Sequence, residues 1–314
     1  MQDLIFVANT VVPVFLIVAL GYVLRRYKLI NDNFVNLSSR IVFNVSLPVL
    51  IFIEVSKIDL HIILDFKLIF FIYLVTLTSY ILIWYVSNFL TDNGNDKSVF
   101  IQGSFRGNFA VVGLALIANL YGPEKLGKAS LLLAFTVPLH NVLAVVVLTI
   151  PVRKERKLDL KSTTKEIIKN PLILGIILAL PFSYFRIPLN ELILTSANYI
   201  AALALPLALL GIGGLLSFND IKEGLKLTSI STLIKLVIIP SAATFIAFKL
   251  GFTGYNLGII FIIFSCPTAI ASFIMAEAMG VNSKLAGNIL LVTTLLSVFT
   301  IALGLFILKQ NGLL

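Results

Sequence analysis

The apolar stretch at residues 98–121 reads SVFIQGSFRGNFAVVGLALIANLY. It is long enough to cross a membrane, because a helix rises about 1.5 Å per residue and the hydrocarbon core is about 30 Å thick. Its middle nevertheless holds Gln102, Arg106, Gly107 and Asn108. Polar and helix-breaking residues occur at that depth only where protein or a cavity satisfies the freed backbone groups. The stretch therefore predicts an interrupted membrane helix with a polar centre.

The composition of the whole chain is typical of a membrane protein. Of 314 residues, 59% are hydrophobic and 12% are charged, whereas about 25% of the residues in a soluble domain are charged. The apolar runs are continuous rather than alternating, which favours transmembrane helices over a β-barrel. One cysteine, Cys266, and two histidines, His61 and His140, predict no metal site, and no cofactor is expected. We therefore predict an all-α polytopic membrane protein.

Charge clusters, glycines and prolines divide the chain into ten predicted transmembrane helices. In order, the predicted spans are 4–24, 34–53, 68–90, 98–121, 126–150, 171–187, 193–216, 227–250, 255–279 and 284–308. The hydrophilic stretch 152–169 carries seven Lys and Arg residues and separates five spans from five. We therefore predict an N-terminal unit at 1–151, a basic linker at 152–169 and a C-terminal unit at 170–314.

Basic residues predict the orientation, because Lys and Arg are enriched in cytoplasmic loops. An N-terminus outside the cell places about twice as many of them inside as outside. We therefore expect a plasma-membrane protein with both termini outside and the basic linker in the cytoplasm. The charges are spread over loops on both faces, so no nucleic-acid surface is expected. Lys235 falls within span 227–250, and its ammonium is expected to extend toward the cytoplasm.

One spacing recurs between the two halves of the chain. Three pairs of corresponding residues lie 158 positions apart: Pro13 and Pro171, Pro48 and Pro206, and Gly122 and Gly280. This agreement predicts a duplication. Each copy has an odd number of spans, so the second copy enters the membrane from the opposite face. Inverted repeats of this kind are typical of secondary transporters, whose site lies near the middle of the bilayer.

The ninth predicted span corresponds to the fourth and is also expected to break. Its Pro267 has no amide hydrogen and clashes with the preceding turn. Two interrupted helices at matching positions of inverted repeats indicate the substrate site, where we expect spans 4 and 9 to cross. The N-terminal ends of the half-helices offer free N–H groups and a positive dipole end, which favour an anion.

Several motifs carry a resemblance to a known family. They are Ser104-Phe105-Arg106-Gly107-Asn108, Leu47-Pro48, Pro138-Leu139-His140-Asn141, and Cys266-Pro267-Thr268 ahead of Ala276-Glu277. In this order they resemble the auxin efflux carrier family, which includes plant auxin exporters and bacterial carriers for malonate or malate. The resemblance covers essentially the whole chain and extends to the fold of the bile acid:sodium symporters.

The resemblance implies an elevator-type carrier. Spans 1, 2, 6 and 7 would form a scaffold that makes a homodimer, and spans 3–5 and 8–10 would form a moving transport domain. It also implies that Asn108, Asn141 and Thr268 face the substrate. This chain has Ala115 and Ser272 where relatives carry prolines. The break in the fourth span must then depend on Gly107 and Gly113, and an auxin-shaped pocket is not assumed.

The charged residues near the predicted site leave alternatives open. Arg106 lies about 12 Å deep at 1.5 Å per residue, where an unpaired guanidinium is costly. It would either neutralise a carboxylate substrate or hold carbonyls freed by the broken helix. Glu277 and His140 are candidates for proton coupling, although a rim carboxylate and a packing histidine explain them as well. Sodium coupling through carbonyls in the spans is a further alternative.

These observations predict a secondary active or potential-driven carrier that exports a small organic anion, a carboxylate. An alternative is a sodium-coupled importer of the bile acid symporter type. A remote alternative is an intramembrane hydrolase that uses Ser104 or Ser265 with His140, and a channel is a third. No phosphate-binding loop is present in the sequence, so ATP is not expected to drive transport. The chain is not expected to be an enzyme.

Overall fold

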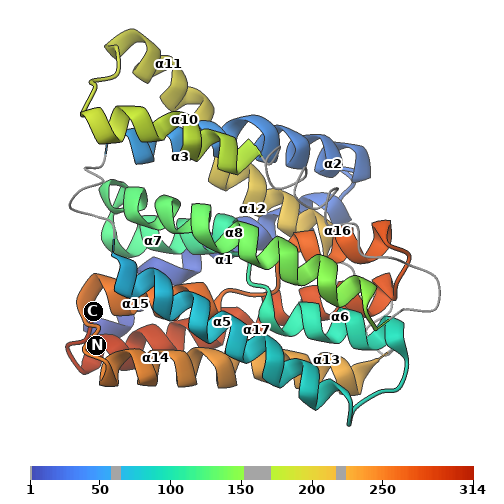
Figure 1. Ribbon diagram of the computed structural model, residues 1–314. Helices are drawn as coiled ribbons and strands as arrows, with labels where there is room; N and C mark the ends of the chain where they lie inside the picture. The colour runs from blue at the N-terminus through green and yellow to red at the C-terminus, as the bar shows by residue number, and fades with distance from the viewer. Residues whose placement is uncertain (1, 58–64, 152–170, 217–223) are drawn as a thin grey trace.

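A computed structural model describes residues 2–57, 65–151, 171–216 and 224–314. This part of the chain is helical and forms no strand beyond an isolated bridge between Gly107 and Thr268 (Figure 1). Seven helical stretches in the described residues, several of them made of consecutive helices, are long and apolar enough to cross a membrane, and three shorter apolar stretches cover 109–121, 171–185 and 254–265. The prediction of an all-α membrane protein is confirmed at this level. The predicted linker at 152–169 lies outside the described residues.

The first half of the chain runs from the N-terminus to the end of α8. Its helices are α1 (Gln2–Arg26), α2 (Asp32–Ile41), η1 (Val42–Ser46), α3 (Leu47–Ser56), α5 (Phe66–Ser87), α6 (Gly94–Phe105), η2 (Phe109–Gly113), α7 (Leu114–Tyr121), η3 (Pro123–Lys125) and α8 (Leu126–Thr149). The second predicted span ends at residue 53, whereas α3 continues to Ser56 and takes in Glu54.

The second half begins at α10. Its helices are α10 (Pro171–Phe185), α11 (Glu191–Ala202), α12 (Ala204–Leu215), α13 (Leu225–Leu233), η4 (Ile234–Ile238), α14 (Ile239–Lys249), α15 (Gly254–Ser265), α16 (Ile270–Ala278) and α17 (Ser283–Gln310). The seventh predicted span is therefore two helices, which meet at Leu203.

Local sequence explains where many helices begin. Asparagine or aspartate precedes five of them, and the side chain accepts a hydrogen bond from the first turn. These caps are Asn31 before α2, Asp65 before α5, Asn93 before α6, Asn190 before α11 and Asn282 before α17. Two wide π-helical turns, η1 and η4, precede Pro48 and Pro240. Proline has no N–H to continue the α-helical ladder, which explains the change of pitch there.

Two pairs of helices from opposite halves pack closely. Helix α1 lies against α12, and α3 lies against α10. A Cβ atom added to Gly213 of α12 would lie 1.9 Å from the Val18 carbonyl oxygen, and one added to Gly21 of α1 would lie 2.2 Å from the Leu210 carbonyl oxygen. Small residues allow membrane helices to approach this closely. Helix α17 meanwhile packs against α6, α13, α15 and α16.

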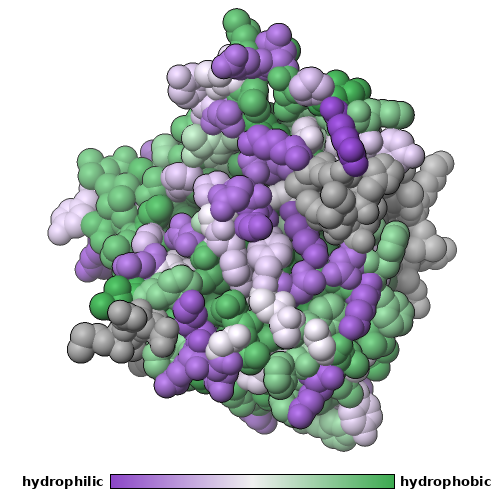
Figure 2. All heavy atoms as spheres, turned by 90° about the vertical axis from the view of Figure 1, so that its left-hand side faces the viewer, coloured by the Kyte–Doolittle hydropathy of each residue, from purple (hydrophilic) through white to green (hydrophobic). Residues whose placement is uncertain are grey.

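The helices run mostly along one direction, and both chain termini lie at the same end of the bundle (Figure 1). Figure 2 looks onto this end face, where hydrophilic side chains gather over the centre. Large apolar side chains are instead exposed along the helices, including Phe70 on α5 and Phe299 on α17, which are 68% and 71% exposed. Polar ends and apolar sides are the arrangement that a bilayer requires.

Candidate functional site

Two interrupted helices meet inside the bundle. Helix α6 ends at Phe105 and the chain becomes helical again at Phe109, while α15 ends at Ser265 and α16 begins at Ile270. The two non-helical segments are joined by their main chains. The Asn108 N–H donates to the Pro267 carbonyl at 2.8 Å, and the Ala269 N–H donates to the Arg106 carbonyl at 3.0 Å. We call this pair of segments, 106–108 and 266–269, the crossing.

A cavity of about 360 Å³ lies at the crossing. It is lined by the first residues of both outgoing half-helices, Phe109 and Ala110 on one side and Ile270 and Ala271 on the other. The first N–H groups of a helix have no partner within that helix and carry a partial positive charge. Two such ends therefore direct positive potential into one cavity of a size that suits a small ligand.

Arg106 adds a full positive charge to the cavity wall. It is 8% exposed, and its guanidinium donates to Asn141 Oδ1 at 2.6 Å and to the Met275 sulfur at 2.9 Å. None of the ion pairs among the described residues includes Arg106. The guanidinium thus contacts an amide and a thioether, neither of which balances its charge.

The two predicted substrate-facing amides both line this cavity. Asn108 is 6% exposed, and its side chain forms no hydrogen bond to another described residue. Asn141 comes from α8 and accepts the bond from Arg106. The structure thus brings Arg106 and Asn108, from the non-helical segment after α6, together with Asn141 from α8.

Thr268 has a different environment from the one expected. Its hydroxyl donates to the Gly103 carbonyl at 2.7 Å, and its N–H donates to the Thr293 hydroxyl at 3.1 Å. It is 1% exposed and does not line the cavity. In this structure Thr268 satisfies a carbonyl at the end of α6 rather than facing the cavity.

The three residues expected at the helix breaks lie close to them. Gly107 is in the non-helical segment, and Pro267 accepts the main-chain bond that joins the segments. Gly113 ends η2, and the ring of Phe109 covers it so closely that an added Cβ would lie 2.3 Å from that ring. The break after α6 therefore occurs at Gly107, two residues before the start of the wide turn that Gly113 closes.

The two candidates for proton coupling lie in different places. His140 lines the cavity and packs edge-on against the ring of Phe105, with 5.8 Å between the ring centroids. Glu277 is exposed near the end of α16 and does not line the cavity. Ser104, a nucleophile of the remote hydrolase alternative, donates to the Phe100 carbonyl and pairs with Ser231 at 2.8 Å. The Ser104 hydroxyl thus bonds to Phe100 and Ser231 and not to His140.

Lys235 is the residue whose position differs most from expectation. The expected extension toward the cytoplasm is wrong, because Lys235 is 1% exposed and its Nζ donates to the Phe264 carbonyl at 3.0 Å. A Cβ atom on Gly107 would lie 2.9 Å from this Nζ. The Lys235 ammonium therefore lies beside the crossing. Its depth in an apolar span is the only sequence signal that points there.

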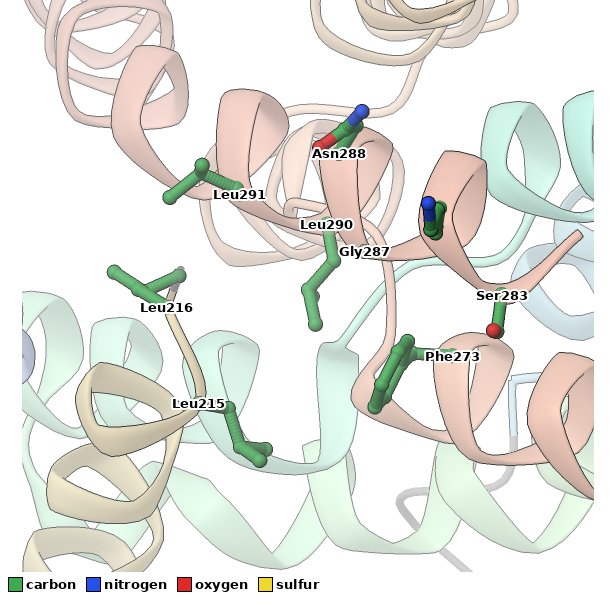
Figure 3. A pocket seen from close by; sticks show the side chains of 9 residues that line it. Leu215, Leu216, Phe273, Ser283, Gly287, Asn288, Leu290 and Leu291 are labelled. Atoms are coloured by element: carbon green, nitrogen blue, oxygen red, sulfur yellow. The ribbon is translucent and has the colours of Figure 1, made fainter. Parts of the chain in front are cut away.

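Two further cavities do not contain the crossing. One of about 220 Å³ lies between the end of α12 and helices α16 and α17, where Leu215, Leu216, Phe273 and Leu290 surround it (Figure 3). Another of about 480 Å³ lies between α1, α3, α7, α11 and α12, and Glu54 is among the residues that line it. The cavity at the crossing is the stronger candidate site because it combines both helix breaks with a buried charge.

Comparison with known proteins gives a consistent result. The sequence model of a family described as membrane transport protein matches residues 6–305. An uncharacterized transporter of Methanocaldococcus jannaschii is 25% identical over 303 residues, which cover 94% of this chain and 96% of the relative. An uncharacterized transporter of Methanothermobacter thermautotrophicus is 23% identical over 297 residues, with the same two coverages.

Proposed function

The chain belongs to the membrane transport protein family, the auxin efflux carrier family that its motifs resemble, and on this basis we propose that it carries a small organic anion, a carboxylate. It is a multi-pass membrane transporter. We propose that it acts without chemical conversion of the cargo and needs no cofactor.

The observation that carries the proposal is the charge of the crossing cavity. Arg106 brings a positive charge that no described acid balances, and two helix N-termini point to the same space. Arginine and free N–H groups bind carboxylates strongly because they donate charge-assisted hydrogen bonds. The unpartnered amide of Asn108 offers one more donor and one acceptor to the cargo.

We propose an elevator mechanism with ten spans in two inverted repeats. In favour of it, α1 packs against α12 and α10 packs against α3, a pattern that is unchanged when the two halves are exchanged. These helices belong to spans 1, 2, 6 and 7, the proposed scaffold. Exposed apolar residues on α11, such as Leu192 and Tyr199 at 76% and 75% exposure, suit a lipid-facing or homodimer surface of that scaffold.

The positions of two cavities support alternating access. The crossing cavity touches α8 from Leu133 to Val145, toward the end that precedes the predicted cytoplasmic linker. The cavity that contains Glu54 touches α8 at Leu126, its first residue. The two spaces thus lie toward opposite ends of one helix. We propose that the structure is open to the cytoplasm at the crossing.

Export of an anion can proceed without a coupling ion. A membrane potential of about 100 mV, negative inside, contributes about 2.3 kcal/mol for each negative charge that leaves the cell. Of the two candidates for a proton-coupling residue, His140 is the better one, because His140 lines the crossing cavity and Glu277 does not. The sodium-coupled importer is the competing function, and it predicts that flux follows a sodium gradient.

Binding of candidate cargo tests the site directly. The purified protein is screened by thermal unfolding against mono- and dicarboxylates and indole acids, because a ligand that prefers the folded state raises the unfolding midpoint. We expect a carboxylate to stabilise the wild type and Asn311→Ala, an exposed amide at the end of α17, but to stabilise Asn108→Ala much less. Equal stabilisation of all three proteins would refute the assignment of the site.

A further inference from the structure

An ammonium group lies at the crossing without a balancing acid. Lys235 is in η4, in the middle of the helical stretch Leu225–Lys249. None of the ion pairs in the described part of the chain includes it, and its Nζ bonds to a main-chain oxygen, that of Phe264. A charge at this depth is costly unless its surroundings satisfy it. The groups that surround the Lys235 ammonium therefore indicate the role of its charge.

The break after α15 frees several carbonyl oxygens, among them those of Ile263 and Phe264. In a continuous helix the Ile263 carbonyl would accept from residue 267 and the Phe264 carbonyl from residue 268. Pro267 has no N–H, and the N–H of Thr268 donates to the Thr293 hydroxyl instead. Both oxygens lie at the negative end of a half-helix, which attracts a cation.

Freed carbonyls at the ends of broken helices are also the ligands that bind sodium ions in secondary carriers. Here the Lys235 ammonium takes one of them, the Phe264 oxygen, at 3.0 Å. Gly107 completes the arrangement: a Cβ atom there would lie 2.9 Å from the ammonium and 3.2 Å from the Ile263 oxygen. The absence of a side chain at this position lets the other broken segment approach the ammonium and the freed carbonyl together.

We propose that the Lys235 ammonium is a tethered cation that occupies the place of a coupling sodium ion at the crossing. The negative end of α15 is then neutralised permanently by the protein, and the carrier needs no sodium to hold the crossing together. The inference rests on the proposed carrier function. It excludes the sodium-coupled importer as an alternative.

The test uses thermal unfolding of the purified protein without any cargo. Wild type, Lys235→Ala, Lys235→Met and the control Lys226→Ala are compared in sodium, methylammonium and choline chloride at equal ionic strength. Lys226 is exposed on the neighbouring helix α13. We expect sodium and choline to give the same midpoint for wild type and control. Lys235→Ala should unfold several degrees lower in choline and recover partly in sodium or methylammonium, whereas Lys235→Met should not recover, because its side chain fills the space without charge.

Three results would overturn the proposal. They are a sodium-specific rise in the wild-type midpoint, a Lys235→Ala protein as stable in choline as the wild type, and equal responses of Lys235→Ala and Lys235→Met to the small cations. If Lys235→Ala cannot be purified, Lys235→Arg replaces it. Greater stability of Lys235→Arg than of Lys235→Met supports the tethered cation, and equal stability contradicts it.

The outcome of this Lys235 test does not depend on the outcome of the carboxylate-binding test. The measurements contain no carboxylate, so a protein that binds no carboxylate can still show that Lys235 replaces a cation. Conversely, a sodium-specific rise in a protein that binds carboxylates would remove the tethered cation and leave the anion site in place.

Discussion

Replacement of Gly213 by alanine should separate two helices that now touch. The added methyl would lie 1.9 Å from the Val18 carbonyl oxygen and 2.8 Å from the Tyr22 nitrogen, and both are main-chain atoms that cannot rotate away. Ordinary contact begins near 3.5 Å, so α1 and α12 must move apart by about 1.5 Å. A gap of that size removes much of the dispersion energy along the interface, and overpacking itself costs about 1–3 kcal/mol.

We therefore expect Gly213→Ala to lower the free energy of unfolding by about 3 kcal/mol, which corresponds to a fall of roughly 4–5 °C in the unfolding midpoint of a chain of this length. The matched control is Gly211→Ala in the same helix, where the nearest atom, Ser39 Oγ, would lie 3.6 Å from the methyl. That change should leave the midpoint unchanged or raise it slightly. The reasoning fails if differential scanning fluorimetry gives both variants the same midpoint.

Three further changes test the site and its surroundings. Arg106→Gln should raise the dissociation constant of a bound carboxylate about 10- to 100-fold, or about 1.4–2.8 kcal/mol, measured by titration calorimetry; an unchanged constant would remove Arg106 from the site. In Gly107→Ala the added methyl would lie 2.9 Å from the Lys235 ammonium and should displace it. We expect the flux into liposomes to fall at least about tenfold, which corresponds to a rise of about 1.4 kcal/mol in the activation free energy. Flux equal to that of the wild type would contradict the close approach. Asp65→Ala removes the cap of α5 and the partner of Lys128 at 3.4 Å and of Asn256 at 3.1 Å, so the unfolding free energy should fall by about 1–2 kcal/mol; an unchanged chemical denaturation curve would show that this network does not stabilise the fold.

The helix breaks could be predicted from sequence because their causes are local. Pro267 lacks the N–H that an α-helix needs, and Gly107 tolerates an extended backbone within an apolar span. Proline alone is an incomplete signal, however. Pro13 and Pro138 lie inside helices α1 and α8, which continue through them. The break at Leu203 between α11 and α12 was not predicted from the sequence.

The roles of the polar residues could not be predicted in the same way, because they depend on partners far along the chain. Thr268 bonds to Gly103, 165 positions away, and Lys235 bonds to Phe264 on another helix. A threonine or lysine within an apolar span indicates that a partner is required, but the span does not identify it. Arg106 and Asn108 could be assigned to one region because they are neighbours in sequence, whereas Asn141 was placed there by family resemblance alone.

The join between the two broken segments has an evolutionary consequence. Its two hydrogen bonds, from Asn108 to Pro267 and from Ala269 to Arg106, use main-chain atoms only. Mutations that exchange the side chains around the cavity therefore leave the atoms of these two hydrogen bonds in place. Descendants of one ancestral protein can therefore diversify in what they recognise while they inherit the same main-chain connection.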